Sequence, residues 1–320
     1  MEKDIGKNLA LDFVRVTESA AIAAAKWIGR GDGKAADKAA VDEMRDRFNQ
    51  INFSATVVIG EGEKDQAPKL YTGEKIGSGD GPEMDLAVDP LEATDSVAFG
   101  RSNAQSMIVL GPKGSLLHAP DTYMNKIAAG GEAAKVIDLD ASVETNIKAV
   151  AKALNKGVSD VTVIVMDRPR HETLIQEIRQ VGAKIHLITD GDVAAAIAAC
   201  LPDSGIDLLM GIGGSTEAVL AAAAVKVLDG GIFCRFVPRN EADKIEIEKC
   251  LDQAGIKDIS KIFSADDLAK GNELSFTATG ILDGPMIAGV DFKDNTVITH
   301  SIAMRSATKT IRYITTYHKK

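Results

Sequence analysis

The pattern of apolar and polar positions, and the order of helices and strands it predicts, differs between the first and second halves of the chain. From Leu9 to Ile28 the apolar residues recur at helical spacing on one face, which predicts a helix that ends at Gly29. A second helix is expected over 37–49. Strands are expected over 55–59, 86–88, 106–110 and 115–117, with a long loop over 64–82. This half is therefore predicted to be mixed or antiparallel.

After about residue 155 predicted strands and helices alternate. Repeated strand–helix units of this kind are typical of a parallel sheet, whose ligands bind at the C-terminal ends of the strands. The predicted strands are 161–166, 184–188 and 208–212, the predicted helices are 172–181, 193–200 and 216–228, and further strands are expected between 274 and 317.

Acidic residues follow two of the strands in the first half. Glu61 lies on the glycine-flanked loop Gly60-Glu61-Gly62-Glu63. Asp89 closes the other strand, where Pro90 is expected to stop it, and Glu92 and Thr94 follow on the turn into a helix. Hard divalent cations such as Mg²⁺ and Mn²⁺ prefer oxygen ligands and can activate a water for phosphate chemistry. These residues predict a metal site, although an acidic turn with Glu92 near a helix start is the simpler alternative.

Polar loops follow all three strands of the second half: 167–171, 190–192 and 213–217. Arg168 and Arg170 flank Pro169 and could clamp a phosphate that is not cleaved, while Asp190 and Asp192 suit sugar hydroxyls. Two arginines on a turn are more often simply solvated, so the neighbouring acidic loop carries part of this argument. His171 is interpreted as a hydrogen-bonded loop histidine and not as a catalyst.

Composition narrows the class of protein. The 320 residues are 45% hydrophobic and 26% charged, as in an ordinary globular protein, and the net charge of −9 argues against a general nucleic-acid surface. Three cysteines at spacings that fit no zinc motif suggest reduced thiols. The N-terminus resembles no signal peptide and no long apolar run could span a bilayer, so we expect a cytoplasmic protein without membrane contact.

Several motifs occur together and in order: Arg15-Val16-Thr17-Glu18-Ser19-Ala20, the Gly60–Glu63 loop, Asp89-Pro90-Leu91-Glu92-Ala93-Thr94, Ala119-Pro120-Asp121-Thr122-Tyr123-Met124, Arg168-Pro169-Arg170-His171, Asp190-Gly191-Asp192 and Gly211-Ile212-Gly213-Gly214. From about residue 9 to the C-terminus this series resembles the class II fructose-1,6-bisphosphatases. That bacterial family belongs to the lithium-sensitive, metal-dependent sugar phosphatases.

The resemblance implies an α/β protein, with a layered α/β/α/β/α sugar-phosphatase fold, a mixed N-terminal sheet and a mostly parallel C-terminal sheet. We expect a metal- and phosphate-binding lobe over 1–155 and a sugar-phosphate-binding lobe over 156–320. The implied reaction is hydrolysis of the 1-phosphate of fructose 1,6-bisphosphate in gluconeogenesis, with Mn²⁺ or Mg²⁺, by a homo-oligomer (dimer or tetramer).

The resemblance also implies roles for individual residues. Thr94 is expected to orient or deprotonate the attacking water, with Glu61 and Asp89 as the other catalytic residues. The expected metal ligands are Asp37, Glu61, Asp89, Glu92 and Glu217. The expected substrate-binding residues are Glu92, Ala93, Thr94, Tyr123, Arg168, Pro169, Arg170, Asp190, Gly191, Asp192 and Gly214.

One position departs from the family pattern, which has Gly where this chain has Ala93. If the backbone there has positive φ, the Cβ would strain the turn or crowd the phosphate. Ala93 keeps open the alternative of a non-catalytic sugar-phosphate sensor. Relatives of the family that accept both substrates leave open a dual fructose-1,6-/sedoheptulose-1,7-bisphosphatase, and the weak Gly211–Thr216 match leaves open a nucleotide-binding oxidoreductase.

Overall fold

The computed structural model describes residues 6–62, 69–79 and 81–319. The chain divides into two compact units, one formed by Met1–Leu116 with Gly271–Lys320 and the other by Leu117–Lys270. Among the described residues, no helix combines the length and the apolar character needed to cross a membrane. Each unit is built on its own mixed sheet, so the expected α/β class is confirmed; the five-layer arrangement stays a prediction.

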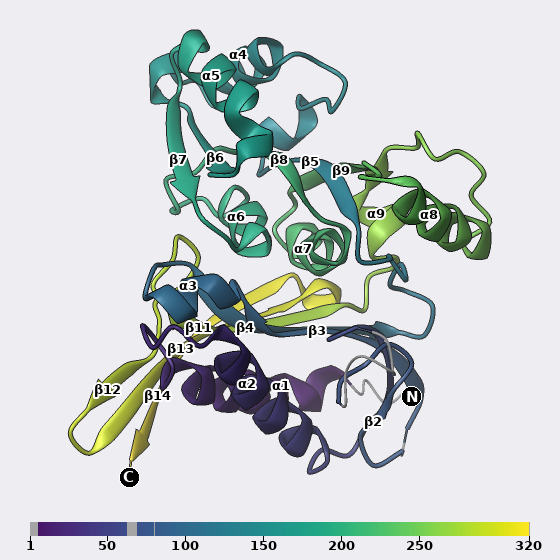
Figure 1. The fold of residues 1–320 in the computed structure, drawn as a ribbon, viewed down its shortest axis with the longest axis vertical. Helices are drawn as coiled ribbons and strands as arrows, with labels where there is room; N and C mark the ends of the chain where they lie inside the picture. The colour runs from purple at the N-terminus through teal and green to yellow at the C-terminus, as the bar shows by residue number, and fades with distance from the viewer. Residues whose placement is uncertain (1–5, 63–68, 80, 320) are drawn as a thin grey trace. The chain divides into compact units, whose positions relative to one another are not determined.

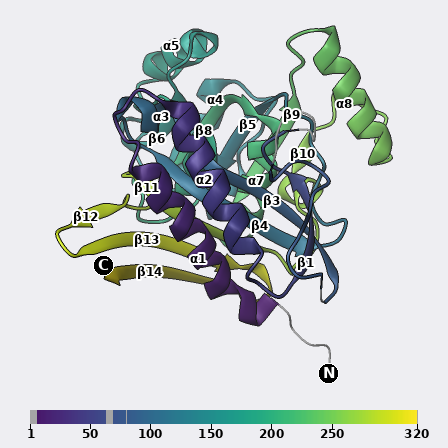
Figure 2. The ribbon, with the colours of Figure 1, turned by 60° about the horizontal axis from the view of Figure 1, so that its bottom comes forward.

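The first unit holds a sheet with the strand order β12-β13-β11-β4-β3-β1-β2, and β14 pairs with β13. Its helices α1 and α2 lie side by side across one face of this sheet (Figures 1 and 2). The elements are α1 (Gly6–Ala25), α2 (Gly33–Phe48), β1 (Ser54–Ile59), β2 (Lys75–Ile76), β3 (Glu83–Glu92), α3 (Thr94–Phe99), β4 (Ala104–Pro112), β11 (Ser275–Leu282), β12 (Asp291–Lys293), β13 (Thr296–Arg305), the 3₁₀ turn Ser306–Thr308 and β14 (Thr310–Lys319).

The core of this unit lies between the two helices and the sheet. The apolar face of α1 includes Phe13, whose ring makes edge contacts with Phe48 of α2 and with Phe53 just before β1. All three side chains are fully buried. The apolar periodicity of α1 is therefore used to pack the helix onto α2 and the sheet.

Several predicted boundaries of the first unit differ in the structure. The helix α2 begins at Gly33, four residues early, because the Asp32 carboxylate caps it by accepting the Ala35 N–H at 3.0 Å. The strand β3 does not stop at Pro90 but runs to Glu92. Its register with β4 shifts between Asp89 and Glu92, which accommodates a residue without an N–H. Residues 115–117 form no strand of their own.

The second unit holds a sheet with the order β10-β9-β5-β8-β6-β7. Helices α4 and α5 cover one face of this sheet, and α6 and α7 cover the other (Figure 1). The elements are β5 (Tyr123–Ala129), α4 (Val143–Ala153), β6 (Thr162–Met166), α5 (Glu172–Val181), β7 (Lys184–Ile188), α6 (Asp192–Ala198), β8 (Leu208–Gly214), α7 (Ser215–Val227), β9 (Gly231–Phe236), α8 (Glu241–Gln253), β10 (Phe263–Ser264), α9 (Ala265–Leu268) and the 3₁₀ turns Ala133–Lys135, Val158–Asp160 and Pro169–His171.

The expectation of a mostly parallel second sheet is met only in part. β6 pairs in parallel with β7 and β8, as the alternating pattern predicts. β5 lies between β8 and β9 and is antiparallel to both, and β10 is antiparallel to β9. The sheet is mixed because β5, which precedes the alternating segment in the chain, inserts into its middle.

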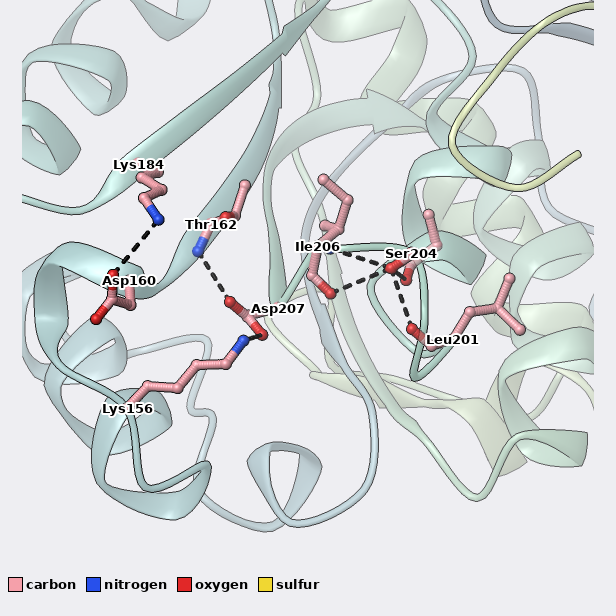
Figure 3. Close-up of polar contacts among 9 residues, drawn as sticks. Lys156, Asp160, Thr162, Lys184, Leu201, Ser204, Ile206 and Asp207 are labelled. Atoms are coloured by element: carbon pink, nitrogen blue, oxygen red, sulfur yellow. Dashed lines mark hydrogen bonds and ion pairs between the residues drawn. The ribbon is translucent and has the colours of Figure 1, made fainter.

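The carboxylate of Asp207 fixes the start of the parallel strands, and Figure 3 shows it between its two partners. One oxygen accepts the Thr162 N–H at 2.9 Å, and the other lies 2.5 Å from Lys156 Nζ. Nearby, the Ser204 hydroxyl accepts the Ile206 N–H at 3.0 Å and closes the turn between α6 and β8 (Figure 3). These contacts hold the N-terminal ends of β6 and β8 in register, which also fixes where their C-terminal ends lie.

Candidate active site

Two predicted acids of the first unit lie at the same edge of its sheet. β1 and β3 are parallel neighbours with Ile59 opposite Ala87. Glu61 and Asp89 each follow two residues later, so both lie beyond the residues that pair β1 with β3, although Asp89 still pairs with Met107 of β4. The Asp89 carboxylate accepts the Leu91 N–H at 3.1 Å, so it is hydrogen-bonded to the backbone just beyond Pro90. Glu63, the second acid of the predicted loop, lies outside the described residues.

The turn from Glu92 to Thr94 carries the remaining predicted groups. Glu92 is buried, and its carboxylate accepts the Gln105 side-chain N–H at 2.8 Å from the neighbouring strand β4. Ala93 has φ 69° and ψ 52°, the left-handed conformation that glycine adopts without strain. Thr94 is the first residue of α3, and its hydroxyl donates to the Leu91 carbonyl at 3.3 Å. The departure from the family pattern therefore lies at a backbone position where a Cβ is costly.

The start of α2 lies against this turn. A Cβ built on Gly33 would lie 2.9 Å from Thr94 Cγ2, so the absence of a side chain lets the helix approach. Asp37 lies one turn further along α2, on the same face as Gly33. The helix thus brings Asp37 toward the turn that carries Thr94.

The charges of this region fit a divalent cation. Burial raises the pKa of Asp37. Burial, and then the negative charge of Asp37, raise the pKa of Glu61 to about 8. Two carboxylates held close together out of water repel each other, and a hard cation bound to both would relieve that repulsion. The described His, Cys, Asp and Glu residues contain no group of three already arranged around one point, so the fit rests on the chemistry of these donors.

In the second unit the predicted arginine turn is attached to β8 at a single residue. The Ile212 N–H donates to His171 Nε2 at 2.7 Å, and the Ile212 carbonyl accepts from Arg170 Nε at 3.0 Å. The other ring nitrogen of His171 contacts the Met166 carbonyl at 2.8 Å, so the ring is neutral with its proton on Nδ1. Burial lowers the pKa of His171 in agreement with this state. The histidine positions the turn that carries Arg168 and Arg170.

Tyr123, the first residue of β5, lies between the arginine turn and a residue that the sequence did not single out. The Arg170 guanidinium carbon is 4.8 Å from the centre of the Tyr123 ring, and that of Arg239 is 4.7 Å away. Asp243 holds Arg239 with two hydrogen bonds of 2.6 and 3.0 Å. Tyr123 and two guanidinium groups therefore form one cationic surface suited to a phosphate.

The Asp190–Asp192 loop is attached at both ends. An Asp190 oxygen lies 3.8 Å from Arg168 NH2, and both side chains are about one-third exposed. Gly191 has φ 86° and precedes α6. Asp192 is buried, and its carboxylate lies 2.6 Å from the buried ammonium of Lys126 on β5. Burial alone would lower the pKa of Lys126, but the negative charges of Asp192 and Glu217 outweigh burial and raise it.

The glycine pair before α7 makes room for two carboxylates. A Cβ on Gly213 would lie 1.7 Å from Asp192 Oδ2, and one on Gly214 would lie 1.8 Å from Glu217 Oε2. The Thr216 hydroxyl donates to Glu217 at 2.8 Å. Burial and the charge of Asp192 raise the pKa of Glu217, with Lys126 opposing them. The predicted metal ligand Glu217 is thus folded against the start of its own helix.

The predicted residues are divided between the two units. The first group contains Asp37, Glu61, Asp89, Glu92, Ala93 and Thr94; the second contains Tyr123, Arg168, Pro169, Arg170, Asp190, Gly191, Asp192, Gly214 and Glu217. Sequence reasoning missed Lys126, Arg239 and Gln105. A lysine among the mostly apolar residues after Tyr123 was the available signal for Lys126.

Comparison with known proteins agrees with this chemistry. Residues 7–318 match the family described as bacterial fructose-1,6-bisphosphatase, glpX-encoded. A "Fructose-1,6-bisphosphatase class 2" of Haemophilus influenzae is 45% identical over 98% of this chain and 97% of its own length. A "Fructose-1,6-bisphosphatase 1 class 2" of Escherichia coli K12 is 42% identical over 98% of this chain and 95% of its own. The chain therefore belongs to the bacterial, glpX-encoded class II fructose-1,6-bisphosphatases, which are phosphoric monoester hydrolases.

Proposed function

We propose that this chain hydrolyses the 1-phosphate of fructose 1,6-bisphosphate, giving fructose 6-phosphate and inorganic phosphate in gluconeogenesis. The observation that carries the proposal is the end of the parallel β1–β3 pair, where Glu61 follows β1, Asp89 lies near the end of β3, and Glu92 and Thr94 add a buried acid and a hydroxyl. Asp37, Glu61, Asp89 and Glu92 would hold Mn²⁺ or Mg²⁺. The bound cation would lower the pKa of a water and neutralise charge on the phosphate.

Thr94 has a defined task in this mechanism. Its hydroxyl already donates to the Leu91 carbonyl, which leaves the oxygen lone pairs to accept a hydrogen bond from the attacking water and so aim it at phosphorus. The left-handed conformation of Ala93, followed by a helical residue, directs successive N–H groups toward one point, a geometry that binds phosphate oxygens. The residues of this turn would thus align the water and the phosphate.

The second group of residues would bind the rest of the substrate. Arg168 and Arg170 would contact the 6-phosphate, together with Pro169 and the ring of Tyr123. Asp190, Gly191 and Gly214 would contact the sugar, and Glu217 would complete the metal ligands. The proposal that the enzyme works as a dimer or tetramer, in the cytoplasm, rests on the resemblance to the family.

Phosphate release from fructose 1,6-bisphosphate and sedoheptulose 1,7-bisphosphate, with Mn²⁺ or Mg²⁺ and with chelator, tests the reaction and ranks the substrates. Thr94→Val keeps the methyl group that packs near Gly33 but removes the hydroxyl, whereas Thr94→Ser keeps the hydroxyl. We expect the valine variant to lose about 100-fold or more in kcat and the serine variant to stay within about 10-fold. Equal kcat in folded Thr94→Val would remove Thr94 from the mechanism.

A second pair of variants tests the metal ligands. Asp89→Asn should abolish metal-dependent turnover, whereas Asp95→Asn, at an exposed acid in the first turn of α3, should not. Loss of turnover in both variants would mean that the change acts through the fold of the turn. Full metal-dependent activity in Asp89→Asn would exclude Asp89 as a ligand.

A further inference from the structure

A buried lysine lies in the middle of the second sheet. Lys126 is on β5, with Gly211 of β8 on one side and Cys234 of β9 on the other. Its side chain is 3% exposed, that of Asp192 is 7% exposed, and the charged atoms are 2.6 Å apart. A buried ion pair contributes little net stability compared with apolar side chains of the same volume. The pair is therefore better explained by what it holds in place.

The surroundings of Asp192 fix its carboxylate from two sides. The missing side chain of Gly213 leaves the space that the carboxylate occupies, since a Cβ there would overlap it at 1.7 Å. Lys126 Nζ closes the same space, 3.2 Å from that Cβ position. Asp192 is the first residue of α6, directly after Gly191 in the left-handed conformation. Holding its carboxylate therefore fixes where the Asp190–Asp192 loop ends.

We propose that Lys126 is a positioning residue that sets the Asp190–Asp192 loop for sugar phosphate through its ion pair with Asp192. The inference rests on the proposed role of this loop in binding substrate. Lys126 itself touches no substrate. Without the ammonium, Asp192 would turn toward water and Asp190 and Gly191 would move with it. The expected consequence is weaker binding of the sugar and a smaller effect on the chemical step.

A double-mutant cycle tests the proposal with Lys126→Met, Asp192→Asn and the variant carrying both. Steady-state phosphate release from fructose 1,6-bisphosphate gives KM and kcat, and calorimetric titration with fructose 6-phosphate gives a Kd that does not depend on turnover. We expect Lys126→Met to raise KM and Kd about 10-fold or more, as when a supporting residue is lost, with a smaller fall in kcat. In the Asp192→Asn background, Lys126→Met should change KM and Kd no further.

Two controls separate positioning from folding. Lys148→Met removes an exposed lysine paired with Glu144 and should leave KM, Kd and the thermal midpoint unchanged. Gly213→Ala displaces the Asp192 carboxylate while both charges remain, and should raise KM and Kd like Lys126→Met. If Lys126→Met does not fold, Gly213→Ala and the doubly neutral variant still give the comparison.

Unchanged KM and Kd in folded Lys126→Met or in Gly213→Ala would overturn the proposal. So would an equal rise caused by Lys126→Met with and without Asp192, because the lysine would then act by another route. The wild-type enzyme is measured in the same assay. Absence of its turnover would count against the proposed reaction, whereas the fructose 6-phosphate Kd values would still decide the role of Lys126.

Discussion

The metal-free protein should become less stable as the pH rises, because of Glu61. Its carboxyl has a pKa of about 8 in the folded chain and an ordinary value of 4.5. Between these pH values the folded chain holds a proton that the unfolded chain has lost, so the folded state is favoured at low pH and loses this advantage as the pH rises through 8. The difference of about 3.5 pH units, at about 1.4 kcal/mol each, amounts to roughly 5 kcal/mol in the free energy of unfolding.

The expected shift in melting temperature follows from the size of the chain. For 320 residues the entropy of unfolding is about 0.7 kcal/mol per degree, so 5 kcal/mol corresponds to about 7 °C. Calorimetry with chelator at pH 5.5 and pH 8.5 covers most of this range and should show a fall of about 5 °C attributable to Glu61. Glu61→Gln, which stays neutral, should abolish that part of the fall, whereas Glu132→Gln at an exposed carboxylate should keep it.

A bound divalent cation should change how the melting temperature depends on pH. Carboxylates must lose their protons to bind Mn²⁺, so the rise in Tm that Mn²⁺ causes should be larger at pH 8.5 than at pH 5.5. The reasoning would be refuted by the same pH dependence in wild type and Glu61→Gln, or by a metal effect that does not depend on pH.

Three further predictions concern single positions. Ala93→Val should lower the calorimetric Tm by about 2–4 °C, because strain at positive φ costs about 1–3 kcal/mol. Ala93→Gly should not lower the Tm. Equal Tm values for wild type and Ala93→Val would refute the strain. Burial lowers the pKa of His171. Its contribution to the free energy of unfolding is therefore present above pH 6.5 and is lost as the pH falls below that value. His171→Gln should therefore remove part of the acid destabilisation, measured as Tm at pH 7.5 and 5.5, and an unchanged acid loss would contradict this. Asp207→Ala should cost about 1–3 kcal/mol in urea unfolding, because it leaves the Thr162 N–H unpaired, with KM unchanged; a raised KM at full stability would contradict a purely structural role.

The alternating half of the chain could be predicted closely from its sequence. The helix 172–181 and the strand 184–188 match α5 and β7 residue for residue, because apolar periodicity there is decided locally. The same reasoning missed β5. Its apolar run is interrupted by Asn125 and Lys126, and the lysine is stable in the sheet only because Asp192, 66 residues away, supplies the opposite charge.

The candidate site shows the same division between local and distant information. The acids near the ends of β1 and β3 could be predicted from the local pattern of apolar and acidic residues, although β3 continues past Pro90. The left-handed conformation of Ala93 could not be predicted from the alanine itself, which does not favour it; only the Gly of the family pattern indicated it. Arg239 could not be found either, because its place beside Tyr123 depends on the return of β9 to β5.

The interrupted first unit has a consequence for synthesis on the ribosome. β4 ends at Pro112, but its partner β11 begins at Ser275, after the whole second unit has been translated. At about 5–20 residues per second, the intervening segment takes roughly ten to thirty seconds to emerge. During that interval the nascent chain carries an unpaired β4 edge, while the second unit has everything it needs to fold. The strand edge of β4 is therefore where a translating chain has most need of a chaperone.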